Sequence, residues 1–181
     1  MHLLLSGEGA MDIGVCHSGM KLCDKDGFQI GPMSWMVDQL VEASQGYEFS
    51  YLQNPCFTYV SESFLAENKP KPAKKGIRLR GKKKPPETQY YYENARALAV
   101  AAKLKAEELE DTVIAVLFRD ADGMASAGRG YWKHKRDSMI HGFQAEGFEL
   151  VPVYKCQAIE IQLKNRKKTR KNPVRDGIII I

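Results

Sequence analysis

The sequence predicts an α/β fold in which helices flank a parallel-rich central sheet, and three observations support this prediction. Short apolar runs alternate along the chain with segments of helical pattern. The run 113–118 (VIAVLF) is apolar at every position, which is typical of a strand covered on both faces. Residues 93–109 are rich in Ala, Leu, Lys and Glu, which favour a helix. A chain of 181 residues is long enough to bury the core of one such domain.

The first half of the chain predicts a strand, a helix and a second strand. Residues 2–6 form a short apolar run that ends in the turn sequence GEG. Residues 33–43 repeat apolar side chains near helical spacing, and Pro32 suits the first turn of that helix. Apolar and polar side chains alternate over 47–52, which predicts the second strand.

The second half predicts a helix over 93–109, a strand over 113–118, a helix over about 131–145 and a strand over 149–154. The closing run 178–181 is apolar, so it predicts either a strand that needs a partner or a chain cut short. We expect a single domain over 1–163 with a basic insertion at about 66–88, followed by a basic tail over 164–181.

Two basic segments dominate the charge distribution. Residues 69–84 carry nine Lys or Arg and residues 164–175 carry seven, with no acidic residue in either segment. The rest of the chain has 11 basic residues against 22 acidic ones. Basic arms on an acidic body suit the binding of a polyanion, so we expect nucleic acid, DNA or RNA, as a partner. The alternative interpretation is that both segments are solvated loops that maintain solubility. The cations expected to contact the nucleic-acid backbone are Lys74, Lys75, Arg78, Arg80, Lys82, Lys83, Lys84, Arg129, Lys133 and Lys135.

The composition predicts a cytoplasmic protein. No apolar run approaches the roughly 18 residues of a membrane span, so no membrane contact is expected. The opening MHLLLSGEG is too short an apolar run for a signal peptide. Four cysteines without such a signal indicate a reducing compartment. Cys16, His17 and Cys23 suggest part of a zinc site, but their spacing is unusual and favours structural cysteines.

Four acidic residues follow the ends of two predicted strands. Glu8 and Asp12 come after the strand 2–6, and Asp120 and Asp122 come after the strand 113–118. The carboxyl ends of parallel strands meet at one edge of a sheet, where four carboxylates would repel unless a divalent cation neutralised them. All-oxygen ligation suits Mg²⁺ or Mn²⁺, and paired ions can clamp a phosphodiester displacement. The sequence therefore predicts a metal site at these four residues. The alternative is that both motifs are merely polar turns.

The two acidic motifs resemble those of the Toprim domain, which topoisomerases, bacterial primases and OLD-family nucleases share. In that domain, as in SGEGAMD and VLFRDADG, one strand ends in GEG with an acid four residues later, and a downstream strand ends in DxDG. The fuller stretch SGEGAMDIGVC…GPMSWMVDQLVE is similar to small stand-alone Toprim-like proteins of bacteria, some of them from phage-defence loci. The resemblance covers about residues 2–154.

The resemblance implies a Toprim-like Rossmannoid fold and a Mg²⁺-dependent nuclease that cleaves phosphodiester bonds in bacterial anti-phage defence. Under it, Glu8 is a catalytic residue that holds metal or acts as acid and base. Asp120 and Asp122 match the catalytic, metal-binding DxD pair, and Asp12 falls where OLD-like nucleases place a second acid. The chain departs from the family in the turn residues Ala10 and Met11, in the basic insertion and in its final segment.

Two other functions stay open. The chain can be a latent or non-catalytic Toprim subunit that an ATPase partner regulates, and copies of it can form a homo-oligomer. It can also be a phosphatase of the haloacid-dehalogenase type, because VLFRDADG matches that family's hhhhDxDG motif. Asp120 would then accept the phosphoryl group, but in those enzymes this residue lies near the start of the chain.

Overall fold

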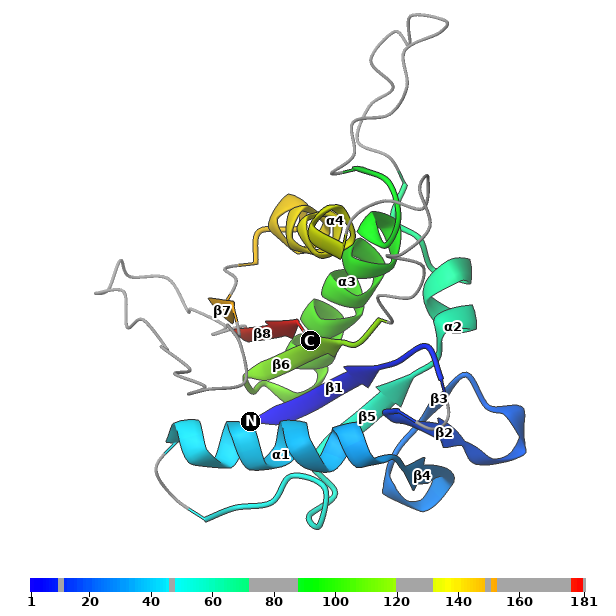
Figure 1. Cartoon of the computed structure of the whole chain (residues 1–181). Coiled ribbons are helices and arrows are strands. Elements are labelled where there is room, and N and C mark those ends of the chain that lie inside the picture. Colours follow the sequence, from blue (N-terminus) through cyan, green and yellow to red (C-terminus); the bar gives the residue numbers. More distant parts are fainter. Residues whose placement is uncertain are drawn as a thin grey trace, which may run out of the picture.

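The computed structural model describes residues 1–9, 12–45, 48–71, 88–119, 132–148, 151–152 and 177–180. These residues form a six-stranded sheet, a two-stranded sheet and helices on both faces of the larger sheet (Figure 1). The strands are β1 (His2–Ser6), β2 (Gly14–Cys16), β3 (Leu22–Cys23), β4 (Phe28–Ile30), β5 (Phe57–Val60), β6 (Val113–Leu117), β7 (Val151–Pro152) and β8 (Gly177–Ile180). The helices are α1 (Pro32–Gln45), α2 (Glu62–Glu67), α3 (Tyr92–Leu109) and α4 (Trp132–Ala145), and two single 3-10 turns, His17–Gly19 and Lys25–Gly27, flank β3.

The large sheet is mostly parallel and has the strand order β3-β5-β1-β6-β8-β7. β1 lies between β5 and β6 and runs parallel to both, with Leu4 opposite Thr58 on one side and Ala115 on the other. β8 pairs in parallel with β6 and β7, and only β3 is antiparallel to its neighbour. The predicted α/β class with a parallel-rich sheet is therefore confirmed. The closing apolar run was predicted to be either a strand in need of a partner or a chain cut short, and its described residues form β8, which pairs on both sides.

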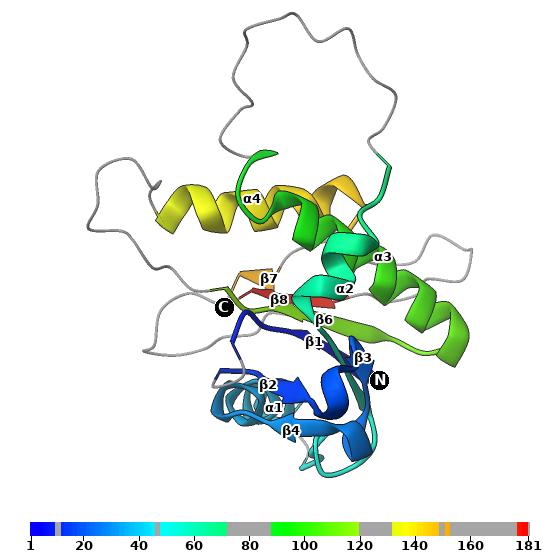
Figure 2. The same cartoon turned by 90° about the vertical axis from the view of Figure 1, so that its right-hand side faces the viewer.

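Each face of the sheet has its own hydrophobic core, because successive side chains of a strand point to opposite faces. Leu3 and Leu5 of β1 pack with Val37 and Val41 of α1. Leu4 packs on the opposite side with α3 and α4, together with Ala115 of β6. Two views show α1 on one side of the sheet and α3 and α4 on the other (Figures 1 and 2). All five residues of β1 and of β6 are buried, and this confirms the prediction that β6 is covered on both faces.

The strand predicted over 47–52 is wrong for residues 48–52, which form a turn region instead. Asp38 of α1, which is buried, organises this turn by accepting hydrogen bonds from the Tyr51 backbone N–H at 2.7 Å and the Ser50 hydroxyl at 2.5 Å. Tyr51 and Leu52 are buried because the turn folds onto the core, so their pattern imitates a strand. The strand that follows α1 is β5, which begins at Phe57, five residues after the end of the predicted strand.

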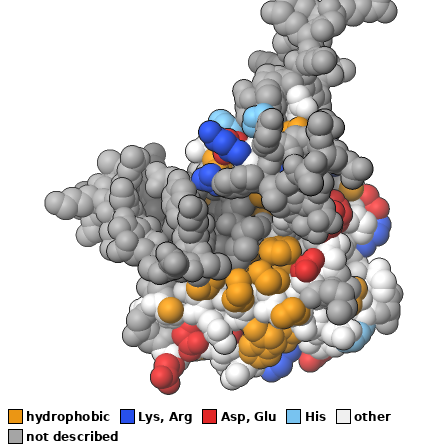
Figure 3. All heavy atoms as spheres, viewed as in Figure 1, with side chains coloured by type: hydrophobic (Ala, Val, Ile, Leu, Met, Phe, Trp, Pro, Cys, Tyr) orange, Lys and Arg blue, Asp and Glu red, His pale blue; other side chains and the backbone are white. Residues whose placement is uncertain are grey.

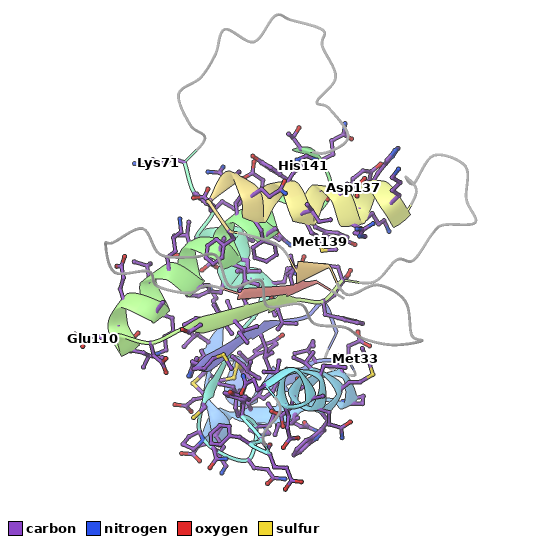
Figure 4. The ribbon with its side chains drawn as sticks, turned by 90° about the vertical axis from the view of Figure 1, so that its left-hand side faces the viewer. Met33, Lys71, Glu110, Asp137, Met139 and His141 are labelled. Carbon is purple, nitrogen blue, oxygen red and sulfur yellow. A yellow bond between two sulfur atoms is a disulfide. The ribbon has the colours of Figure 1, made fainter. Side chains whose placement is uncertain are left out.

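Helix α4 packs closely across the first half of α3. Gly142 permits this contact, since a Cβ atom there would lie 2.4 Å from the Tyr92 carbonyl oxygen and 2.7 Å from Ala95 Cβ. Arg96 then joins the two helices through Glu146, with Nε 2.8 Å and Nη2 2.7 Å from Glu146 Oε1. Met139 lies on the side of α4 toward the sheet, whereas His141 lies on its outer side (Figure 4).

Most predicted elements are present with slightly different ends. The helices predicted over 33–43, 93–109 and about 131–145 correspond to α1, α3 and α4. The strand predicted over 149–154 is described only at Val151–Pro152. Residues 72–87 of the basic insertion lie outside the described residues, as does the basic tail before β8. Among the described residues, no helix is both long and apolar enough to cross a membrane.

Candidate functional site at the carboxyl edge of the sheet

The carboxyl ends of β1 and β6 lie side by side. The two strands are parallel neighbours, with Ser6 opposite Leu117, and the Phe118 N–H donates to the Ser6 carbonyl oxygen at 2.8 Å. The segments that carry the two acidic motifs therefore leave the sheet at the same edge, as the sequence predicted. Asp120 and Asp122 themselves lie outside the described residues, as does Arg129. The sharing of one metal site by all four acids stays a prediction.

The turn after β1 is anchored by the start of α1. Asp12 accepts a hydrogen bond at its carbonyl oxygen from Met33 N–H at 3.0 Å. The Ile13 carbonyl oxygen accepts from Gly31 N–H at 2.9 Å and from the Ser34 hydroxyl at 2.6 Å. Gly31 approaches so closely that a Cβ atom would lie 2.2 Å from the Asp12 carbonyl oxygen. The backbone beside Asp12 is thus fixed by α1, while the Glu8 side chain, four residues earlier in the sequence, is exposed.

Arg119 is the cation at the centre of this edge. It lies two residues after the end of β6, it is only 6% exposed, and its Nη1 donates to the Phe118 carbonyl oxygen at 2.7 Å. Its guanidinium carbon lies 5.8 Å from the centre of the Tyr91 ring. Burial lowers the pKa of Arg119, and the nearby carboxylates of Glu62 and Glu8 oppose that shift. A positive charge is therefore held among acidic groups where the parallel strands end.

Glu62 places the end of a third strand, β5, at the candidate site. It begins α2 two residues after β5, and Ser61 caps this helix by accepting a hydrogen bond from Phe64 N–H at 3.3 Å. Because β5 lies beside β1, the acidic start of α2 reaches the same edge as Glu8 and Arg119. The sequence analysis did not identify Glu62 or Arg119. The available signal was a single cation between an all-apolar strand and two acids.

The tyrosine cluster at the start of α3 packs onto the protein. Tyr90, Tyr91 and Tyr92 follow the basic segment 69–84, where aromatic side chains can either stack on unpaired bases or pack on the core. Tyr91 packs against the core beside Arg119, and its N–H donates to the Ser138 hydroxyl at 3.3 Å. Tyr92 lies under the guanidinium of Arg96 at 5.9 Å, and only Tyr90 of the three is exposed. These contacts support a packing role for Tyr91 and Tyr92.

The predicted phosphate-binding cations are only partly described. Lys133 is exposed and Lys135 is half-buried, both near the start of α4. Ser138 of α4 contacts Tyr91 and Glu146 contacts Arg96, so the first turn of α4 lies toward the carboxyl edge. The seven cations of the insertion that were predicted to bind phosphate lie outside the described residues: Lys74, Lys75, Arg78, Arg80, Lys82, Lys83 and Lys84.

Within the described residues, no group of three or more His, Cys, Asp or Glu is arranged to hold a metal ion. Of the four predicted ligands, that part of the chain contains Glu8 and Asp12, whose carboxylates suit Mg²⁺. Cys16 and Cys23 are joined by a disulfide, with sulfur atoms 2.07 Å apart, rather than forming a zinc site. The structural role expected for these cysteines is confirmed, but the expectation of reduced thiols is not met at this pair.

Comparisons with known proteins identify no relative of this chain. No model of a protein family matches the chain. No curated protein and no solved structure matches it either. The site is therefore interpreted from its own geometry and from the two acidic motifs.

Proposed function

We propose that this chain is a Toprim-like, Mg²⁺-dependent nuclease that cleaves nucleic-acid phosphodiester bonds. The observation that supports this most is the parallel pairing of β1 with β6, because it brings the segments that bear the two acidic motifs to one edge. Edges of this kind are where open α/β sheets bind their ligands. The resemblance of SGEGAMD and VLFRDADG to Toprim motifs supplies the reaction class.

In the proposed mechanism, Glu8, Asp12, Asp120 and Asp122 hold the metal. A bound divalent cation would supply activation of the attacking water and charge stabilisation at the leaving oxygen. Lys133 and Lys135, together with the cations of the 69–84 segment, hold the sugar-phosphate backbone without reading its sequence. The anchoring of Asp12 by α1 keeps one ligand in place before metal binds.

The direct test is cleavage of supercoiled plasmid and of tRNA by purified protein with Mg²⁺ or Mn²⁺. We expect Asp120→Ala, Asp122→Ala and Glu8→Gln each to lose cleavage by at least about a hundredfold while remaining folded. Glu107→Gln is the matched control, because Glu107 is an exposed acid near the far end of α3. Full metal-dependent cleavage by any of the first three variants would remove that residue from the site.

The basic insertion is tested separately through salt dependence. Replacing residues 69–84 by a Gly/Ser linker removes nine cations. Nucleic-acid affinity should fall, and the slope of log affinity against log salt should become shallower, since fewer counterions are released. An unchanged slope would show that this segment is a solvated loop with no ligand.

A second candidate function, a subunit that needs a partner, is favoured by one specific observation. Among the described residues, five of the eight exposed large apolar side chains belong to the stretch of chain from β2 to α1: Val15, Met20, Leu22, Trp35 and Met36 are each 39% to 49% exposed. Figure 3 shows hydrophobic side chains gathered on the face that carries α1. Surfaces of this kind often bind another protein. A folded chain that binds nucleic acid but cleaves none with any divalent metal would favour this function over an autonomous nuclease.

A further inference from the structure

Three buried polar atoms at the carboxyl edge lack hydrogen-bond partners. In the part of the chain that the structure describes, they are Ser6 Oγ and the Nε and Nη2 atoms of Arg119. Ser6 is fully buried, and it ends the strand next to the one that Arg119 follows. The unpartnered atoms therefore belong to two adjacent strand ends rather than being scattered through the fold.

The Nε–H and Nη2–H groups of an arginine point in the same direction and form the fork that binds an oxyanion in a bidentate manner. Arg96 uses this same fork on Glu146, at 2.8 and 2.7 Å. Arg119 uses only its remaining nitrogen, on the Phe118 carbonyl oxygen. Its fork is thus available for a ligand from outside the protein.

Leaving this fork unpaired is costly. A buried donor without a partner loses the hydrogen bonds that water would provide, and an arginine cannot avoid this cost by losing its proton. The Tyr91 ring and the carboxylates of Glu62 and Glu8 offset part of the charge, but they do not provide hydrogen bonds to the two fork atoms. Buried polar groups left unsatisfied in this way are expected at functional sites.

We infer that Arg119 and Ser6 form a subsite for one phosphate group of a nucleic-acid backbone. The Arg119 fork donates two hydrogen bonds to the phosphate oxygens, and the Ser6 hydroxyl donates a third. The choice of nucleic acid as the source of the phosphate rests on the proposed function. The anion chemistry rests on the fork alone. Arg119 is then a binding residue that holds a phosphate beside the acids that would hold metal.

The experiment titrates inorganic phosphate into metal-free protein and follows backbone amide chemical shifts, with chloride at equal ionic strength as reference. The wild-type protein should show saturable phosphate-specific shifts at Ser6, Gly7 and Arg119. Arg119→Lys should weaken phosphate affinity at least about tenfold because a lysine cannot form the fork. Ser6→Ala should weaken it by about threefold, and it provides an independent variant if Arg119→Lys does not fold.

Arg96→Lys is the matched control, since Arg96 is similarly buried but already paired, and it should leave phosphate affinity unchanged. The inference is overturned if phosphate and chloride act alike on the wild-type protein, or if Arg119→Lys and Ser6→Ala both bind phosphate as the wild type does. Where phosphate binds through Arg119, a single-stranded oligonucleotide should compete with it in the wild-type protein. Failure of that competition would assign the subsite to a small phosphate compound and overturn the nucleic-acid part of the inference.

The outcome separates this subsite from the nuclease function. Asp120→Ala should abolish cleavage without weakening phosphate affinity, because the subsite needs no metal. Phosphate binding through Arg119 in a protein that cleaves nothing would keep the subsite and remove the nuclease. Cleavage without Arg119-dependent phosphate binding would keep the nuclease and remove the subsite.

Discussion

The regions around Arg96 and Arg119 place similar buried arginines in different surroundings. Arg96 is 9% exposed and Arg119 is 6% exposed, and each guanidinium lies beside a tyrosine ring. Arg96, between α3 and α4, has its fork on Glu146 and a second acid, Glu93, at 3.5 Å. Arg119, at the sheet edge, has no protein partner on its fork within the described residues. The paired fork of Arg96 stabilises the fold, whereas the unpaired fork of Arg119 is available to bind a ligand.

The largest expected effect compares the two arginines directly. Arg96→Met should lower the free energy of unfolding by about 3 kcal/mol, because it leaves Glu146 with a largely buried charge and no cation. Arg119→Met should change it by no more than about 1 kcal/mol, or raise it, because an unpaired buried charge is removed. Urea denaturation measures both. Equal losses in the two variants would show that Arg119 also has a structural partner.

His2 adds a third buried basic group, at the opposite end of β1 from Ser6. Its Nε2 lies 2.9 Å from the Thr58 hydroxyl oxygen, and burial lowers its pKa to about 4. Because the ordinary pKa of histidine is about 6.5, the unfolded chain binds a proton between pH 6.5 and 4 that the folded chain does not. Stability should therefore fall as the pH decreases through this window, by an amount on the order of 2 kcal/mol. Histidine escapes the cost of burial by staying neutral, which Arg119 cannot do.

The test replaces His2 by Gln, which can still hydrogen-bond to Thr58 but does not titrate. Urea denaturation at several pH values should show a smaller loss of stability between pH 6.5 and 4 in His2→Gln than in the wild type. His141→Gln is the control, since His141 is exposed on α4, and it should keep the wild-type pH dependence. An unchanged pH profile in His2→Gln would mean that other groups cause the loss.

Two glycines test whether the two regions differ in function as well as in stability. Gly142→Ala and Gly31→Ala both place a Cβ atom against backbone, at 2.4 and 2.2 Å, so each should cost about 2 kcal/mol. Gly142→Ala, near Arg96, should leave metal-dependent cleavage per folded molecule unchanged. Gly31→Ala should reduce cleavage about tenfold or more, because it displaces the backbone of Asp12. If Gly31→Ala cleaved as well per folded molecule as Gly142→Ala, Asp12 would not belong to the metal site.

The same contrast explains what the sequence could predict. β1, β6, α1 and α3 were predictable because their apolar patterns reflect burial by neighbouring elements. β5 was missed because its four residues, FTYV, form a short run, while the turn held by Asp38 gave a more regular alternation. Local patterns carry the period of a strand, but they do not distinguish a strand from a turn that packs its side chains onto a core.

The site was predictable only where a motif lies in one segment. Glu8 and Asp12 were found from SGEGAMD, and the parallel pairing of β1 with β6 followed from the predicted fold class. Glu62 was not found, because its relevance depends on β5 being the neighbour of β1. Arg119 lies within the motif VLFRDADG, yet only the structure shows that its fork lacks a partner. Hydrogen-bond satisfaction is a property of the folded chain and leaves no pattern in the sequence.

The smallest expected effect concerns the charge around the Arg119 fork. The Glu62 carboxylate lies near enough to favour the charged form of Arg119, so it should also repel an anion bound there. Glu62→Gln should therefore raise phosphate affinity about two- to threefold at low salt. The gain should disappear at about 1 M salt, where the Debye length falls to about 3 Å. The glutamine side chain can still accept the hydrogen bond that Glu62 Oε1 receives from Asn94 at 3.2 Å, so the start of α2 should stay in place.

Glu67→Gln is the control for this experiment, because Glu67 ends the same helix and is paired with Lys21. It should leave phosphate affinity unchanged at both salt concentrations. A weaker affinity in Glu62→Gln would show that Glu62 orients Arg119 rather than competing with the anion. Arg119 would then depend on the Glu62 carboxylate for its position, as Arg96 depends on Glu146. The two arginines would differ in their distance from these carboxylates rather than in function.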